Sequence, residues 1–114
     1  MLETPKYLLI LLKRYAYDPN THHISKINVQ IKSGSYDRNS NNIILEIKDI
    51  PYKLLSTVFH KGPLPTQGHY FSVIKQNRHY YQMNDHNVQK LNEITKTSAI
   101  LKSGDDYILL YEKC

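Results

Sequence analysis

The sequence has one cysteine, Cys114, and no tryptophan. A single thiol cannot form an intrachain disulfide, and a chain without disulfides is typical of a reducing compartment. The chain has no Cys-x-x-Cys pair, which excludes a zinc ribbon within it, and none of its six histidines stands in a His-Glu-x-x-His motif. The sequence therefore favours an intracellular protein, cytoplasmic or nuclear, that uses no metal and no cofactor.

Long apolar runs are also missing. The longest extends from Tyr7 to Leu12, far short of the ~20 apolar residues that cross a bilayer. It is short for the core of a signal peptide too, and Lys13-Arg14 follows it where small residues of a cleavage site would stand. We therefore expect a buried strand here, with Lys13 and Arg14 as its solvated flank, and no association with a membrane.

Basic residues outnumber acidic ones, 15 to 10, which gives a net charge of +5. Nucleic-acid-binding domains usually gather such charge into a patch, whereas here it is scattered. A weaker alternative function remains, a basic β module for single-stranded nucleic acid. In this alternative, the bases of the nucleic acid would stack on Tyr70, Tyr80 and Tyr81, with Lys75 and Arg78 as the neighbouring cations.

Ten tyrosines in 114 residues favour β structure. Alternating apolar residues and turn residues predict a single domain over residues 1–114, α+β but mostly β, with an antiparallel sheet and at most one short helix. Loops are expected at 34–42 and 62–68, a break at 49–51, and the helix at 92–101. The expected strands are 7–15, 26–32, 43–47, 52–60, 69–75, 79–84 and 107–111.

A histidine and two candidate partners stand on neighbouring strands of an expected hairpin. If residues 69–75 pair with 79–85 around a turn at 76–78, His69 lies ~5 Å from Asn84 or Asp85. A side-chain oxygen there can accept Nδ1–H and leave Nε2 as a base, and Gly68 allows a backbone or ligand to approach closely. These are two of the three parts of a cysteine-protease site.

Seven short blocks, in this order, extend the pattern over nearly the whole chain. They are Leu-Lys-Arg-Tyr (12–15), Lys-Ile-Asn (26–28), Tyr-Lys-Leu (52–54), His-Lys-Gly (60–62), Gly-His-Tyr (68–70), Tyr-Gln-Met-Asn-Asp (81–85) and Tyr-Ile-Leu-Leu-Tyr (107–111). Together they resemble the C-terminal half of the ubiquitin-specific protease catalytic domain. The resemblance implies the palm-like part of a papain-like cysteine protease.

The resemblance also implies a reaction, the hydrolysis of isopeptide bonds at the C-terminus of ubiquitin. It makes His69 the general base, Asn84 the residue that orients its ring, and Asp85 a supporting polar residue. Ubiquitin or a ubiquitinated protein would be the partner.

A substrate-binding region follows from the same resemblance. His60 and Gly62 match the segment before a loop, residues 63–67, that borders the channel for ubiquitin's tail. Gly68 and Tyr70, on either side of the histidine, would complete this region.

The nucleophile of the family has no counterpart in the sequence. The family's cysteine stands in the N-terminal half, in an Asn-x-x-Asn-x-Cys type of segment, and residues 1–52 contain nothing similar. Cys114 follows a terminal strand and has no helix N-terminus to stabilise a thiolate. Two interpretations stay open: a fragment whose cysteine-bearing half lies elsewhere, or a remnant that binds ubiquitin without turnover. Both predict that the isolated chain is inactive.

Overall fold

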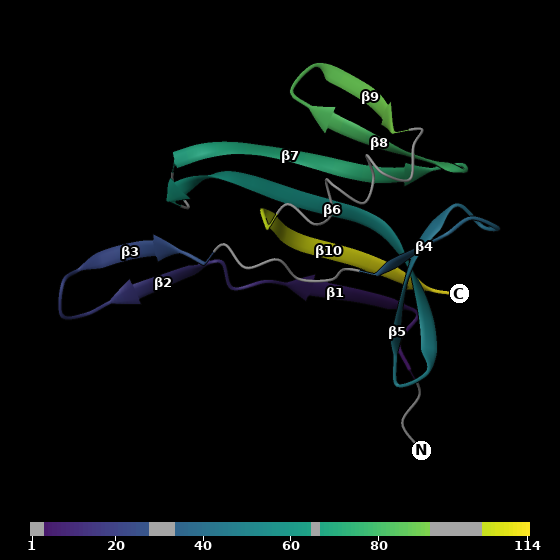
Figure 1. The fold of residues 1–114 in the computed structure, drawn as a ribbon, viewed down its shortest axis with the longest axis horizontal. Coiled ribbons are helices and arrows are strands. Elements are labelled where there is room, and N and C mark those ends of the chain that lie inside the picture. Colours follow the sequence, from purple (N-terminus) through teal and green to yellow (C-terminus); the bar gives the residue numbers. More distant parts are fainter. Residues whose placement is uncertain (1–3, 28–33, 65–66, 92–103) are drawn as a thin grey trace.

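The structure is a computed structural model that describes residues 4–27, 34–64, 67–91 and 104–114 (Figure 1). In these ranges the chain forms strands, and they pair antiparallel throughout. The strands are β1 (Tyr7–Leu11), β2 (Tyr15–Asp18), β3 (His23–Lys26), β4 (Ser35–Asp37), β5 (Asn42–Ile47), β6 (Ile50–Leu64), β7 (Gln67–Gln76), β8 (His79–Asn84), β9 (Asn87–Leu91) and β10 (Asp106–Lys113).

Eight of these strands form one sheet, in the order β1-β10-β6-β7-β8-β9, with β5 and then β4 added beside β6. Strand β6, 15 residues long, joins the parts. One of its edges pairs with β10, while the other pairs first with β5 and then with β7. Strands β2 and β3 form a separate hairpin that projects beyond the end of β1 (Figure 1).

A bulge within β6 keeps its buried side chains on one face of the sheet. Tyr52 and Leu54 are buried in its first half, but Thr57 and Phe59 are buried in its second. The buried positions change from even to odd numbers at a register shift against β10, where Leu55 is the extra residue. The extra residue shifts the alternation by one position, so that Leu54 and Thr57 both lie on the face of their buried partners, Tyr111 and Leu109.

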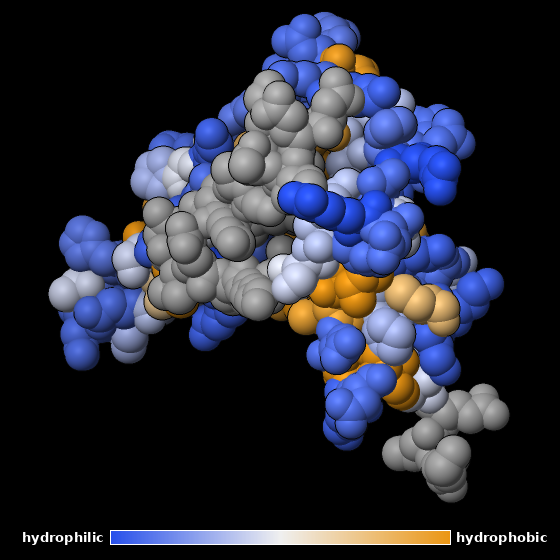
Figure 2. Space-filling model, turned by 45° about the vertical axis from the view of Figure 1, so that its right-hand side comes forward, coloured by the Kyte–Doolittle hydropathy of each residue, from blue (hydrophilic) through white to orange (hydrophobic). Residues whose placement is uncertain are grey.

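The core consists of apolar side chains from β5 to β10. Its members are Ile43, Tyr52, Leu54, Phe59, Phe71, Val73, Tyr80, Leu91, Leu109 and Tyr111. The molecule is flat, 49 × 43 × 20 Å. Apolar side chains reach the surface in the lower part of the space-filling view, beside hydrophilic ones (Figure 2).

The mostly-β antiparallel prediction is confirmed, with differences in detail. The strand expected at 7–15 is divided into β1 and β2, and residues 34–42, expected as a loop, contain β4. The break expected at 49–51 lies at its first residue: the chain turns at Lys48 and Asp49, both with positive φ, and Pro51 already pairs with Glu46. Proline is tolerated there because it stands at the start of a strand.

Two expectations concern residues that the structure does not describe. The helix at 92–101 lies outside the described ranges, as does most of the strand at 26–32. The strand β9, by contrast, was not expected from the sequence. Within the described ranges there is no helix with the length and apolar character needed to cross a membrane.

Candidate functional site

His69 and Asn84 bring their side chains together on one face of the β7–β8 hairpin. Nε2 of His69 and Oδ1 of Asn84 are in hydrogen-bond contact, and both residues are half-buried. Because an amide oxygen only accepts, Nε2 has the proton, and Nδ1 of the neutral ring keeps its lone pair. The expected contact is therefore present, but through the other nitrogen, so that Nδ1 rather than Nε2 is left to act as a base.

The hairpin reaches this contact in a register different from the expected one. Its turn contains two residues, Asn77 and Arg78, where three were expected. Continuing the ladder by its antiparallel rule places Asn84 opposite Phe71, so His69 reaches Asn84 diagonally along the same face. A two-residue turn with a positive φ of 58° at Asn77 is a common hairpin connection.

Asp85 has a different position from Asn84. It lies in the turn between β8 and β9, has a φ of 53°, and is exposed. The structure thus brings Asn84 to the imidazole of His69 and leaves Asp85 at the adjoining turn.

Two glycines shape the backbone that leads into His69. Lys61 pairs with His69 and Leu64 with Gln67, so β6 contains one residue more than β7 between these pairs. Gly62 and Gly68 face each other in this bulge with φ of 149° and 129°. A Cβ on Gly62 would lie 2.6 Å from the carbonyl oxygen of Gln67, so the bulge requires glycine.

His60 lies on the other face of the sheet and is 1% exposed. Its Nδ1 contacts the hydroxyl of Tyr15, and its Nε2 lies 3.1 Å from the carbonyl oxygen of Gln67. Tyr70, the residue after His69, is 49% exposed, and its ring lies 4.5 Å from the ring of His60. Of the four residues predicted to bind substrate, His60 is thus enclosed, while Tyr70 offers an open surface.

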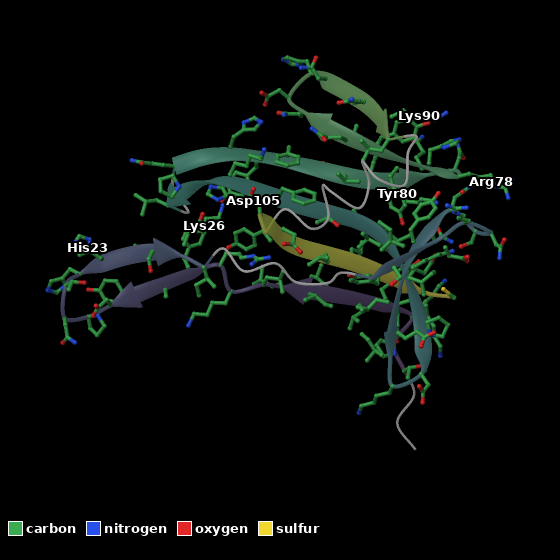
Figure 3. The ribbon with its side chains drawn as sticks, in the orientation of Figure 1. His23, Lys26, Arg78, Tyr80, Lys90 and Asp105 are labelled. Carbon is green, nitrogen blue, oxygen red and sulfur yellow. The ribbon has the colours of Figure 1, made fainter. Side chains whose placement is uncertain are left out.

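Two ion pairs at the base of the β2–β3 hairpin were not found from the sequence. Arg14, expected as a solvated flank, is 3% exposed and forms a buried ion pair with Asp106. Its Nε also donates to the backbone oxygen of Asp106 over 2.8 Å. Beside it, Nζ of Lys26 lies 2.7 Å from Oδ1 of Asp105 (Figure 3). The adjacent acids Asp105 and Asp106, where the last strand begins, are the sequence feature behind both pairs, although it does not identify their partners.

Burial dominates the electrostatics of these groups. Burial raises the pKa of Asp106, and the charge of Arg14 opposes this. The pKa of Tyr15 is also raised, by burial first and then by Tyr70, Tyr107 and Asp105. Tyr15 therefore stays a neutral hydroxyl group that can donate to His60.

Cys114 lies far from His69 along the sheet. Lys113 pairs with Tyr52, whereas His69 pairs with Lys61 farther along the same strand β6. With the rise per residue of a β-strand, Tyr52 and Lys61 are about 30 Å apart along β6. The exposed thiol of Cys114 is thus out of reach of this imidazole.

The tyrosines proposed for stacking on nucleic acid do not share an exposed surface. Tyr80 is 2% exposed, donates to the carbonyl oxygen of Leu54 over 2.8 Å, and accepts from the backbone of Ile43. Tyr70 alone of the three is exposed. A stacking platform needs several open rings on one face, which this arrangement does not provide.

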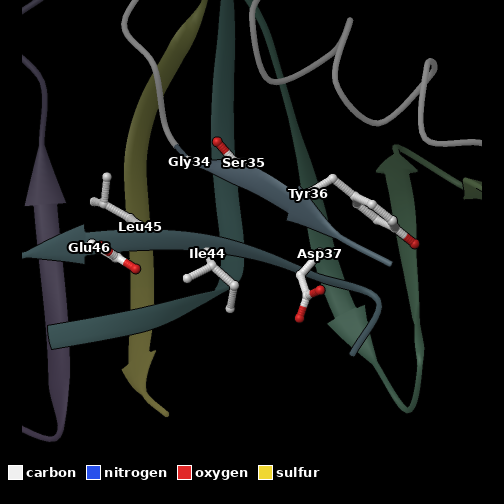
Figure 4. Close-up of a pocket in the computed structure, with 7 residues that line it drawn as sticks. All are labelled: Gly34, Ser35, Tyr36, Asp37, Ile44, Leu45 and Glu46. Atoms are coloured by element: carbon white, nitrogen blue, oxygen red, sulfur yellow. The ribbon is translucent and has the colours of Figure 1, made fainter. Parts of the chain in front are cut away.

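A separate pocket lies between β4 and β5 (Figure 4). It is lined by Gly34, Ser35, Tyr36, Asp37, Ile44, Leu45 and Glu46. Its carboxylates have no imidazole or thiol beside them in this lining. The pocket therefore adds no group to the His69–Asn84 pair.

Comparison with known proteins agrees with the arrangement of the strands. A protein from Arabidopsis thaliana, ubiquitin carboxyl-terminal hydrolase 4, is 31% identical over 115 residues, which cover 95% of this chain and 31% of that protein. The chain therefore spans about a third of the length of this relative.

Solved structures of a similar fold include the SAGA Ubp8/Sgf11/Sus1/Sgf73 DUB module, with a TM-score of 0.74, 24% identity, and coverage of 96% of this chain and 24% of that chain. A form of this module bound to monoubiquitin has a TM-score of 0.71 and 27% identity, again over 96% of this chain and 24% of that one. The family model described as ubiquitin carboxyl-terminal hydrolase matches residues 1–111. This match spans nearly all of the sequence, and the chain belongs to the ubiquitin carboxyl-terminal hydrolase family.

Proposed function

We propose that residues 1–114 form the histidine- and asparagine-bearing part of a ubiquitin-specific thiol protease, and that another segment supplies the nucleophilic cysteine. The observation that supports this most directly is the contact between Nε2 of His69 and Oδ1 of Asn84. A base whose second ring nitrogen is held by an amide oxygen is the arrangement of Cys-His-Asn proteases.

In the proposed reaction, Nδ1 of His69 takes the proton of the cysteine thiol, and the thiolate attacks the carbonyl at the end of ubiquitin's tail. The imidazolium then gives its proton to the departing lysine amine, which leaves a thioester. Water attacks the thioester with His69 as base and restores the thiol. Asn84 holds the ring throughout by accepting from Nε2–H.

The shape of the described part supports a second segment. The molecule is only 20 Å along its shortest axis, while most domains bury a sheet under a second layer. Edge strand β1 exposes Tyr7, Leu9 and Leu11, at 51%, 68% and 65%. An apolar edge of this kind is usually covered by another part of the protein.

Ubiquitin is the proposed partner because related structures contain it. One similar DUB module is bound to monoubiquitin, and another, 26% identical, is bound to ubiquitin aldehyde. On this chain, the bulge of Gly62 and Gly68 leads directly into His69 and would border the tail, whereas the exposed ring of Tyr70 lies on the other face of the sheet. We also propose a cytoplasmic or nuclear location, which a fluorescent fusion would test.

A first experiment uses ubiquitin with an electrophilic C-terminus. Because Cys114 is about 30 Å from His69 along the sheet, the isolated chain should form no covalent adduct that the Cys114→Ser variant lacks. An adduct on Cys114, located by mass spectrometry, would contradict the proposal. Titration with ubiquitin, intact and without its last residues, then tests recognition of the tail; equal affinity for both forms would count against it.

A second experiment separates an enzyme part from a remnant that only binds. The chain is mixed with the cysteine-bearing part of a family member, and hydrolysis of a fluorogenic ubiquitin substrate is followed. Activity that needs both parts and disappears with His69→Ala supports the enzyme. Binding of the tail with no activity in any mixture favours the remnant.

A further inference from the structure

His60 is nearly inaccessible to solvent, yet it lies next to the backbone that leads into His69. Its side chain is on the face of the sheet opposite to His69, because it pairs with Tyr70 while His69 pairs with Lys61. The buried imidazole therefore cannot touch a substrate on the face of His69. Its influence on that face passes through the backbone.

The hydrogen-bond partners of His60 fix its tautomer. The carbonyl oxygen of Gln67, 3.1 Å from Nε2, can only accept, so Nε2 has the proton. Nδ1 of the neutral ring is then an acceptor, and the hydroxyl of Tyr15 donates to it. Both contacts therefore require the same tautomer of His60, the one with the proton on Nε2.

This imidazole also occupies the space under Gly68. A Cβ on Gly68 would lie 2.8 Å from Nε2 of His60 and would collide with the carbonyl oxygen of Lys61. The backbone of Gln67 and Gly68 is therefore held between the ring of His60 and strand β6. Because His69 is the next residue, the position of this backbone also fixes the position of its Cα.

The position of His60 is itself fixed from β3. Nζ of Lys26 donates to the backbone oxygen of His60 over 2.7 Å and forms an ion pair with Asp105. Tyr15 on β2 is the residue after Arg14, which is paired with Asp106. The β2–β3 hairpin thus anchors both the backbone and the ring of His60.

We propose that Tyr15 and His60 form a positioning pair that holds His69 against Asn84 from the opposite face of the sheet. The inference rests on the proposed function only in regarding His69 as the base. Tyr15 and His60 are positioning residues here and touch no reacting atom.

The test is an NMR measurement on the isolated, ¹⁵N-labelled chain at about pH 8, where most imidazoles are neutral. The tautomer ratio of His69 is read from its ring nitrogens. Tyr15→Phe removes only the hydroxyl, which contacts Nδ1 of His60 and lies 3.4 Å from the carbonyl oxygen of Gly62. We expect the ratio of the Nε2–H tautomer of His69 to its Nδ1–H tautomer to fall at least about threefold. A change of this size corresponds to the free energy of one weak hydrogen bond.

Tyr17→Phe is the matched control. Tyr17 stands on the same strand, its hydroxyl also contacts a histidine Nδ1, that of His22, over 2.8 Å, and it is 58% exposed. The Tyr17→Phe substitution should leave the tautomer ratio of His69 unchanged. Near-UV circular dichroism and the melting temperature show whether each variant is folded.

A pair of substitutions at His60 keeps the inference testable if Tyr15→Phe does not fold. His60→Gln can still donate to the carbonyl oxygen of Gln67, whereas His60→Phe retains a ring and loses both contacts. The His69 ratio should be closer to wild type in His60→Gln than in His60→Phe. An unchanged His69 ratio in folded Tyr15→Phe, or equal ratios in the two His60 variants, would overturn the inference. Failure to bind ubiquitin's tail would instead count against the proposed function alone.

Discussion

His69 and Asn84 meet as diagonal neighbours on one face of the β7–β8 hairpin, and Nε2 of the imidazole faces the amide oxygen. This contact leaves Nδ1 as the nitrogen of the neutral ring that has a free lone pair. It also makes the contact depend on the two-residue turn, since one added residue would move Asn84 to the other face.

Replacing Asn84 with leucine tests this contact directly. The variant should lose the protected Nε2–H resonance of His69, because the acceptor is gone, and about 1 kcal/mol of unfolding free energy. ¹H–¹⁵N spectra and urea unfolding are the measurements. Asn87→Ser, at an exposed site across the next turn, should retain the resonance. A resonance that survives in Asn84→Leu would mean that another group binds Nε2.

The buried ion pair between Arg14 and Asp106 gives a second prediction. Arg14→Met should lower the unfolding free energy by about 3–5 kcal/mol at neutral pH, because it leaves a buried carboxylate without its cation. Urea unfolding measures this. Lys53→Gln, which breaks a half-exposed pair with Glu112, should have little effect and is the control.

The loss in Arg14→Met should also depend on pH, with a defined sign. Burial already raises the pKa of Asp106, and removing Arg14 removes the charge that opposes this shift. A carboxyl group whose folded-state pKa is raised favours folding below its unfolded value and loses that contribution as the pH rises through the folded value. The variant should therefore recover stability relative to wild type as the pH falls toward about 4. A loss that grows in acid would contradict this assignment.

Tyr80 gives a prediction in alkaline solution. Burial raises its pKa to about 12, above the value of about 10 for an unfolded tyrosine. The folded state thus binds this proton more tightly, and its contribution to stability is present below pH 10 and is lost as the pH rises toward the folded value. Between about pH 10 and 11 the unfolding free energy of the wild type should fall with pH more steeply than that of Tyr80→Phe. The difference between the two slopes should be up to about 1.4 kcal/mol per pH unit. Equal slopes in both proteins would contradict the prediction.

Gly68 gives a prediction about the bulge. Gly68→Ala should cost about 2 kcal/mol or more, because its φ of 129° is unfavourable for alanine and the new Cβ would collide with Lys61. The Nε2–H resonance of His69 should weaken as well. Ser72→Ala, at a regular paired position of the same strand, is the control. Similar stability of the two variants would show that the bulge tolerates a side chain.

Strands with local signals were predicted well. The strand at 79–84 has the bounds expected from its alternation, and the hairpin with β7 follows from the polar residues between them. The length of the turn was not evident, because Gln76, Asn77 and Arg78 are all compatible with a turn. Only the pairing of Gln76 with His79 decides the register.

Contacts between distant segments were harder to predict. Arg14 follows an apolar strand and was expected in solvent, but Asp106, 92 residues later, makes its burial favourable. His60 was assigned to the substrate channel through a resemblance, and its burial follows from Tyr15 and Gln67, which approach it from other strands. No local pattern records such partners.

By itself the sequence determined that this chain forms antiparallel strands and that His69 and an amide oxygen stand on the two arms of one hairpin. Alternation and turn residues act over a few positions, so the sequence expresses them directly. Only the tertiary structure decided which ring nitrogen faces Asn84, which face His60 occupies, and that Cys114 lies far along the sheet. These depend on register and bulges, which the whole sheet sets when distant strands pair.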